Sequence, residues 1–371
     1  MKYYLSGFLL IALLFVTRCE HSTEPRSGLL IYIAADGKKL PVKSPAEWET
    51  KRQQILEGME LAMGELPGRT NLPPLAIQIK DSVQEEFYTR YRIHFTAAEN
   101  EIVPAYLYIP KGKANGKKRP AMLALHGTGD GGKNLVDGTN PETKRPVANE
   151  LAQRGYVVIA PDYPSMGELK DYDFANDRYE SATMQAIFNH MRCVDLLQAR
   201  DDVDPERIGV IGHSLGGHNS MFVGAFDKRL KVIVSSCGWT LMDYYNIGEE
   251  GTKRYGGRLG PWAQDRYMPL LRDKYQLDAD RIPFDFDGVI AALAPRAFFS
   301  NSPLNDSNFD VEGVKEGIAS ASEVYRFLDA PENLQVRYPD AGHDFPEDIR
   351  LEAYRFIDNK LGYTPHEPDL H

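Results

Sequence analysis

Gly212-His213-Ser214-Leu215-Gly216-Gly217 joins an apolar run that ends at Ile211 to a segment that can form a helix. The flanking glycines allow a sharp turn without side-chain clashes, and a serine in such a turn holds its hydroxyl away from the sheet. Glycine, serine and glycine at alternate positions are common by chance, so the elements on either side decide the interpretation. A strand before this turn and a helix after it are both expected. Residues 204–207 are typical of a turn that leads into the strand. The stretch therefore indicates a nucleophilic serine at position 214.

The residues after Pro120 have the pattern of a parallel sheet covered on both faces, because short apolar runs alternate with helix-length segments. The expected strands are residues 121–125, 156–160, 208–211, 232–235, 297–300 and 334–338. The expected helices are residues 147–153, 177–199, 215–226 and 311–328. The fold class that follows is α/β, with a mostly parallel central sheet and helices on both faces.

Three features lie outside this regular pattern. Ser44-Pro45-Ala46-Glu47 offers an N-cap, a proline for the first turn and a reciprocal glutamate, so we expect a helix from there to about Met63. Residues 87–95 and 102–109 alternate apolar and polar side chains, which predicts an antiparallel pair at a sheet edge. The interval 238–295, between the sixth and seventh expected strands, is too long for a simple crossover and predicts a cap over the site.

The cap interval is rich in aromatic residues, which either build its own small core or form a wall for a sugar or phenolic group. These residues are Trp239, Tyr244, Tyr245, Tyr255, Trp262, Tyr267 and Tyr275.

Composition narrows the class of protein. A chain of 371 residues with 42% hydrophobic content can form one large α/β domain with additions, or two small domains. Because 53 acidic side chains outnumber 43 basic ones, giving a net charge of −10, nucleic acid is not an expected partner. The cysteines imply no disulfide framework, and Cys193 and Cys237 are expected as small core residues.

The first residues predict export. Met1-Lys2 precedes an apolar stretch, residues 3–16, that is too short to span a membrane comfortably and is typical of a signal peptide. Cys19 stands where a bacterial lipoprotein is cleaved and lipidated, although Arg18 is unfavourable before such a cut. A lipid anchor on Cys19, a soluble periplasmic form and secretion all stay open. We expect a signal peptide over 1–19, an N-terminal extension over 20–80, an α/β domain over 81–363 with the cap at 238–295, and a tail over 364–371.

A serine hydroxyl needs a base within hydrogen-bond reach and a group that orients this base. His343 follows the last expected strand in a turn that would bring it over Ser214, and we expect it to be the general base. The acid is expected just beyond the preceding strand, where Asp306 is the first choice and Asp310 the reserve. A lone histidine elsewhere is more often structural than catalytic. The histidines expected to be structural are His94, His190 and His218.

A tetrahedral intermediate also needs preorganised N–H donors for its oxyanion. Leu215 N–H, at the start of the helix after the serine, is expected to be the first donor. The loop after strand 121–125 is similar to the His-Gly loops of lipases and esterases, so we assign the second donor to Thr128, with Gly127 as its neighbour. Residues expected to contact the substrate are His126, His213, Trp239 and Trp262.

The same loop matches a second motif, because residues 127–133 fit the start of a phosphate-binding loop after a strand. Asn134 follows, where a nucleotide site would have serine or threonine to hold magnesium, so this interpretation is not favoured. No cysteine and histidine pair has zinc spacing. Asp306, Asn308 and Asp310 could bind calcium, but a short acidic loop is usually just solvated.

With these residues in place, the chain from about Ile102 to Leu361 resembles the dienelactone hydrolase-like α/β-hydrolases and, within them, the bacterial acetyl xylan esterase-like carbohydrate esterases. As a set, the matching segments are specific for the fold and the triad but not for the substrate. They are residues 120–127, 160–163, 212–217, 294–296 and 341–343.

The resemblance implies a carboxylic ester hydrolase that deacylates plant cell-wall polysaccharides or related small esters without any cofactor. Glucuronoyl esterases share this architecture but carry arginine directly after the nucleophile, where this chain has Leu215. Cleavage of glucuronoyl esters is therefore not the favoured activity. Some relatives place the acid after an earlier strand, which makes Asp243 a further candidate for that role.

Two other classes of function compete with an exported esterase acting on a small ester or an acylated carbohydrate. A peptidase of the prolyl-oligopeptidase type would use the same triad, but the roughly hundred residues before the sheet cannot build its β-propeller. A non-catalytic carbohydrate-binding protein with a degenerate hydrolase fold would lack a member of the triad, and none is missing in this sequence.

Overall fold

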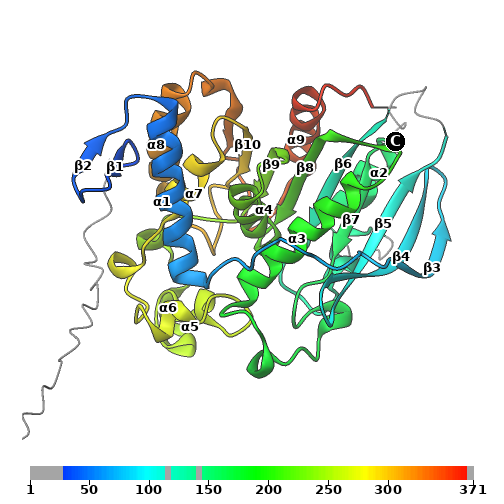
Figure 1. Cartoon of the computed structure of the whole chain (residues 1–371), viewed down its shortest axis with the longest axis horizontal. Coiled ribbons are helices and arrows are strands. Elements are labelled where there is room, and N and C mark those ends of the chain that lie inside the picture. Colours follow the sequence, from blue (N-terminus) through cyan, green and yellow to red (C-terminus); the bar gives the residue numbers. More distant parts are fainter. Residues whose placement is uncertain (1–27, 113–117, 139–143, 366–371) are drawn as a thin grey trace, which may run out of the picture.

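A nine-stranded sheet lies at the centre of the computed structural model, which describes residues 28–112, 118–138 and 144–365 (Figure 1). Its strand order is β11-β10-β9-β8-β6-β7-β5-β4-β3, with parallel pairing from β7 through β11 and antiparallel pairing among the others. The strands are β3 (Gln78–Gln84), β4 (Tyr88–Ala98), β5 (Glu101–Pro110), β6 (Arg119–Leu125), β7 (Val157–Pro161), β8 (Val203–His213), β9 (Leu230–Ser236), β10 (Ala297–Asn301) and β11 (Leu334–Arg337). A separate hairpin pairs β1 (Ile31–Ile33) with β2 (Lys39–Pro41).

Helices cover both faces of this sheet, as the apolar strand runs predict. In β6, Ala121, Leu123 and Leu125 enter one hydrophobic cluster, whereas Met122 and Ala124 enter a second cluster on the other face. The first cluster is completed by α1 (Pro45–Met63), α3 (Ala182–Gln198), α4 (Leu215–Phe226), α7 (Phe286–Leu293) and α8 (Val311–Phe327). The second is completed by α2 (Val147–Gln153) and α9 (Glu347–Lys360). The α/β fold class with a mostly parallel sheet is confirmed.

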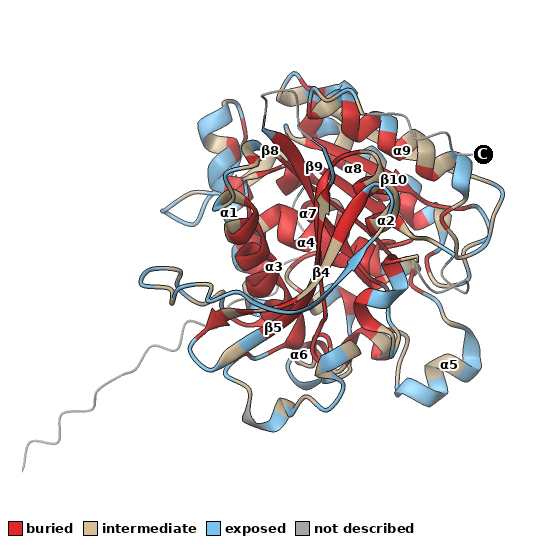
Figure 2. Cartoon of the chain, turned by 90° about the vertical axis from the view of Figure 1, so that its right-hand side faces the viewer, coloured by how far each residue is buried: buried red, intermediate tan, exposed pale blue. Residues whose placement is uncertain are grey.

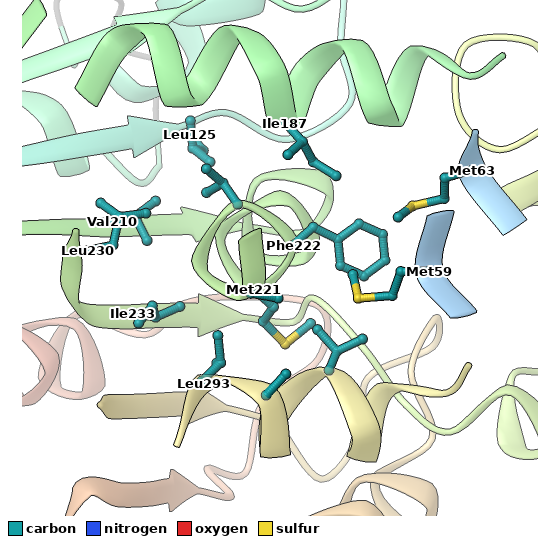
Figure 3. Close-up of a cluster of buried hydrophobic side chains, with 14 of the residues drawn as sticks. Met59, Met63, Leu125, Ile187, Val210, Met221, Phe222, Leu230, Ile233 and Leu293 are labelled. Carbon is teal, nitrogen blue, oxygen red and sulfur yellow. The ribbon is translucent and has the colours of Figure 1, made fainter. Parts of the chain in front are cut away.

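The N-terminal helix α1 forms as its sequence predicts and belongs to the main core. The Ser44 hydroxyl accepts a hydrogen bond from the Glu47 N–H at 3.3 Å, and the Glu47 carboxylate accepts one from the Lys43 N–H at 2.8 Å. Figure 3 shows Met59 and Met63 of this helix pointing toward Phe222 in α4. The expected boundary at residue 80 falls inside β3.

Three elements differ from the sequence-based expectation. The pair β4 and β5 is not at the sheet edge, because β3 lies outside it; every residue of β3 is exposed, so this strand has no apolar pattern to reveal it. The helix expected from residue 177 begins at Ala182, because the Ser181 hydroxyl caps it by accepting from the Met184 N–H at 3.0 Å. Helix α9 was not expected.

The cap interval contains short elements and one helix of the main fold. Helix α5 (Gly248–Tyr255) has no buried residue and projects from the body (Figure 2), whereas α6 (Leu270–Asp273) is a single turn. Helix α7, also within 238–295, packs against α1, α4 and α8 and buries most of its residues. The part of this interval that lies outside the main fold therefore ends before α7.

The topology places the loops that carry the predicted site side by side. The chain passes from β6 to β7 on one side and then returns to β8 on the other side of β6, so the strand order reverses between β6 and β8. Ligands of open α/β sheets bind outside the carboxyl ends of the strands at such a point. The Gly127 loop follows β6 there, and Ser214 follows β8.

Candidate active site

The turn at Ser214 is strained and admits only small neighbours. Ser214 has φ +56° and ψ −121°, and its N–H donates to the Ser236 carbonyl at 2.8 Å. A side chain at Gly212 would place a Cβ 2.3 Å from the Gly216 carbonyl carbon, and one at Gly216 would place a Cβ 2.1 Å from the Leu125 oxygen. Backbone strain of this kind persists where the surrounding structure enforces it. The glycines thus let β8 and α4 meet closely enough to present the serine.

Three predicted residues form one hydrogen-bonded line. Ser214 Oγ lies 3.0 Å from His343 Nε2, and His343 Nδ1 lies 3.0 Å from each carboxylate oxygen of Asp306. The Asp306 side chain is only 1% exposed, and it also accepts the N–H groups of Asn308 and Phe309 at 2.8 and 3.2 Å. These backbone N–H groups hold the carboxylate in place, so it is oriented independently of its contact with the imidazole. This geometry allows proton transfer from the hydroxyl to the ring.

The other candidates for the acid lie elsewhere. Asp310 caps α8 by accepting the Glu312 N–H at 2.8 Å. Asp243 is largely exposed and lies 3.7 Å from Arg258. The structure thus brings Asp306, the first choice, to His343. Asp306 and Asp310, both in the short acidic loop, thus each accept backbone N–H groups of neighbouring residues.

The predicted oxyanion loop lies against the serine turn. A Cβ added to Gly127 would be 3.5 Å from Ser214 Cβ and 3.4 Å from the His213 oxygen, so the loop approaches the nucleophile closely. The Thr128 hydroxyl shares a 2.8 Å hydrogen bond with the Tyr267 hydroxyl of the cap. This bond ties the loop to the cap beside Leu215, the first residue of α4.

Lys133 shows why the loop is not a phosphate cradle. Its ammonium lies 2.5 Å from Asp162 and 2.7 Å from Glu168, and its side chain is 3% exposed. Burial alone would raise the pKa of Glu168, but hydrogen bonds from Lys133 and His94 lower it to about 2. The ammonium group that would bind phosphate in a nucleotide site is therefore paired with two carboxylates.

The residues expected to contact substrate need correction. His126 is fully buried and stacks on Tyr163 at 3.9 Å between ring centroids, and Trp239 is 1% exposed with its Nε1 donating to Ser300. Neither can contact a bound molecule in this arrangement. Trp262 is 9% exposed and stacks on His218 at 4.3 Å, so the buried cap aromatics act chiefly as core.

His213 lies beside the catalytic candidates. Its ring centroid is 4.9 Å from that of His343, and its Nδ1 is 3.0 Å from the Ser236 hydroxyl. Burial, followed by the positive charge of Arg145, holds the pKa of His213 well below its ordinary value. The ring is therefore a neutral neighbour that packs against the imidazole of His343.

The histidines expected to be structural are indeed packing or paired groups. Burial lowers the pKa of His190 and of His218 to about 3 each, and that of His126 to about 4. Among the described residues, neither ring nitrogen of His190 has a hydrogen-bond partner. His94 instead lies 2.9 Å from the Glu168 carboxylate, nearer the surface.

These buried histidines predict acid lability. Their folded-state pKa values lie below the unfolded value of about 6.5. Below that pH the unfolded chain binds more protons than the folded chain, so the free energy of unfolding falls as the pH drops. Between pH 7 and 5, His190 alone should contribute a loss of about 2 kcal/mol. We expect His190→Leu to reduce the fall in unfolding free energy by this amount, measured by denaturant unfolding at both values. An equal fall in both proteins would contradict the assignment.

Cys237 lies next to the site, whereas the sequence predicts only a small core residue at this position. Within the described residues, its Sγ, an Asp306 oxygen and a His343 nitrogen lie within 4.8 Å of one another, a spacing that could hold a metal ion. Burial, followed by the Asp306 charge, raises the pKa of the thiol well above its usual value, and a metal needs the thiolate. Asp306 and His343 already bind each other, so a triad explains this cluster better than a metal site.

Comparison with known proteins agrees with the geometry. The model of the alpha/beta hydrolase family matches residues 122–353. This chain belongs to the alpha/beta hydrolase family. Across 310 residues it is 27% identical to YtaP of Bacillus subtilis (strain 168), covering 81% of this chain and 96% of YtaP.

Two further matches are named as carbohydrate esterases: one is similar in sequence and the other in fold. Carbohydrate esterase MZ0003, from an unknown prokaryotic organism, is 29% identical over 181 residues, which are 46% of this chain and 40% of that protein. A glucuronoyl esterase from Solibacter usitatus has a similar structure, with a TM-score of 0.67, 21% identity and coverage of 91% of this chain and 98% of that chain. The expected resemblance to carbohydrate esterases of the α/β-hydrolase fold is confirmed.

Proposed function

We propose that this protein is an exported serine carboxylic ester hydrolase that removes acetyl groups from plant cell-wall polysaccharides or oligosaccharides. The observation that carries the proposal is the line from Ser214 Oγ through His343 to Asp306, set at a strained turn where a strand meets a helix. A hydroxyl in this arrangement is activated for attack on an acyl carbon.

The mechanism follows from the geometry of the line. Nε2 of His343 takes the Ser214 proton as Oγ attacks the ester carbonyl, while Asp306 holds Nδ1–H and stabilises the imidazolium. The N–H groups of Leu215 and Thr128 would receive the oxyanion, with Gly127 leaving room for it. His343 then protonates the departing alcohol. Water, deprotonated by the same imidazole, attacks the acyl-enzyme and releases the acid and the free serine.

The choice of acetyl groups rests on the residue after the nucleophile and on the sequence resemblance. Leu215 stands where glucuronoyl esterases have arginine, and it is 7% exposed at the start of α4. An apolar side chain there offers no charge to a uronoyl group. The carbohydrate part of the proposal is supported by the match to carbohydrate esterase MZ0003.

Export is supported by the sequence pattern alone. The signal peptide over 1–19 and the lipid-accepting Cys19 lie outside the described residues. In the part of the chain that the structure describes, no helix is both long and apolar enough to cross a membrane. A soluble periplasmic protein, a lipoprotein and a secreted protein are all compatible with this proposal, and labelling of cells with radioactive palmitate tests the lipid on Cys19.

A panel of substrates tests the activity. Wild-type protein should release acetate from 4-nitrophenyl acetate and from acetylated xylan, with slower or no cleavage of methyl ferulate, a glucuronoyl ester and a proline 4-nitroanilide peptide. Fastest cleavage of the glucuronoyl ester would contradict the acetyl assignment, and fastest cleavage of the anilide would indicate a peptidase. Failure to cleave any ester would favour a carbohydrate-binding protein with a hydrolase fold.

A further inference from the structure

A pocket opens beside the start of α4, next to the proposed oxyanion donors. It is small and partly open to solvent, and it is lined by Leu215 and Asn219 of α4, the first turn of α3, Tyr163, and Arg266 with Tyr267 from the cap. Tyr267 also shares a hydrogen bond with Thr128. The pocket therefore adjoins the oxyanion loop and is within reach of a group attached to the reacting ester.

Arg266 brings an unused positive charge to this pocket. Its Nε is buried and has no hydrogen-bond partner among the described residues, and none of their carboxylates forms an ion pair with it. Its guanidinium lies 5.2 Å from the centroid of the Tyr267 ring, which limits its freedom. A buried guanidinium N–H without an acceptor is costly, so a bound acceptor would satisfy it.

The other residues around the pocket add to the positive electrostatic potential that Arg266 creates there. No aspartate or glutamate is among the described residues that line the pocket. Ala182 and Thr183, the first two residues of α3, line it as well, and the N-terminal end of a helix carries a partial positive charge. The Thr183 N–H donates to the Tyr267 carbonyl at 3.1 Å, which holds the helix end against the cap (Figure 1). Two sources of positive potential thus meet in one pocket.

We propose that this pocket binds a carboxylate of the substrate and that the preferred substrates are acyl esters of acidic sugars, such as acetylated uronic acids. The guanidinium fork of Arg266 would bind the carboxylate oxygens, while the ester carbonyl lies over Ser214. This inference rests on the proposed function, since it names the substrate class of the same site. It assigns to Arg266 of the cap a role in specificity.

Matched neutral and charged probes test the proposal. On the acyl side, mono-4-nitrophenyl succinate is compared with 4-nitrophenyl butyrate; on the alcohol side, an acetylated methyl galacturonoside is compared with an acetylated methyl galactoside. Arg266→Met should lower kcat/KM for the acetylated galacturonoside by about 10- to 100-fold, mainly through KM, and leave the neutral members nearly unchanged. A response confined to the succinate pair would place the carboxylate on the acyl side and contradict the assignment to acidic sugars.

The control variant is Arg254→Met. Arg254 also precedes a tyrosine in the cap and lies 5.5 Å from the centroid of the Tyr255 ring, but it is exposed and lines no part of this pocket. It should leave both members of each pair unaffected. A wild-type protein that hydrolyses neutral and charged probes equally well, or an Arg266→Met variant that slows them equally, would overturn the proposal.

A second readout does not depend on turnover. In the Ser214→Ala background, binding of galacturonate measured by calorimetry should weaken about tenfold or more with Arg266→Met and not with Arg254→Met. Absence of galacturonate binding together with equal rates on both probe pairs would overturn the carboxylate site. Hydrolysis of 4-nitrophenyl butyrate by the wild type tests the esterase proposal separately, so the two failures can be told apart.

Discussion

Ser214→Ala should lower kcat for 4-nitrophenyl acetate by about 10⁴-fold or more, because no other group would form the acyl-enzyme. The loss should be confined to activity. Alanine keeps the φ of +56° at the turn as serine does, and the side chain gives up only its 3.0 Å contact with His343. Initial rates and a thermal unfolding curve for the same preparation measure both effects.

A control for this variant is Ser322→Ala. The Ser322 hydroxyl donates to the Ile318 carbonyl within α8, away from the serine turn, so its removal should leave the rate within about twofold. Activity of Ser214→Ala close to that of the wild type would assign the reaction to another residue. Loss of the folded state in Ser214→Ala would instead show that the hydroxyl is needed for stability.

Asp306→Asn should lower kcat by about 10⁴-fold, because an amide can donate to Nδ1 and so stabilise the wrong tautomer of His343. The amide oxygen can still accept the N–H groups of Asn308 and Phe309, so the loop should keep its shape. The expected change is therefore a loss of kcat with little change in the unfolding temperature.

The competing carboxylates serve as controls for the acid. Asp310→Asn and Asp243→Asn should each retain kcat within about threefold, since neither carboxylate contacts His343. A large loss with Asp243→Asn and a small one with Asp306→Asn would transfer the role to the cap side of the site. Equal losses in all three variants would indicate a general effect on folding.

The three hydrogen-bonded residues of the site could be predicted because the fold strongly constrains their positions. A serine between two glycines at a strand-to-helix turn fixes one position, and the loops after the last two strands fix the others, so Ser214, Asp306 and His343 follow from the order of elements. The hydrogen bonds among them in the structure agree with that order. Strands with apolar runs were found for the same reason, since burial on both faces leaves a continuous signal.

Other features depend on tertiary contacts that the sequence does not show. His126 was expected to contact the substrate because it precedes the oxyanion loop, but stacking on Tyr163, from a separate loop, buries it completely. Arg266 is one of several cap cations, and only the assembled pocket distinguishes it. Every residue of strand β3 is exposed, so no buried face marks it in the sequence and only its pairing with β4 defines it.

Helix α9 is different, because its sequence did carry a signal. It begins after Pro346 with Glu347 and Asp348, and Lys360 lies in its last turn, an arrangement that complements the helix dipole. Its apolar side chains Ala353, Tyr354 and Ile357 recur at helical spacing and fill the second cluster. This element could have been predicted from the same rules that located α1.

The central claim is that Ser214 is a nucleophile activated by His343, and covalent labelling tests it most directly. After treatment with a fluorophosphonate, mass spectrometry of the wild type should locate one phosphonyl group on Ser214, and the labelling rate should fall by about 10³-fold or more in His343→Ala. Labelling of another residue, or labelling of Ser214 that is equally fast without His343, would contradict the account.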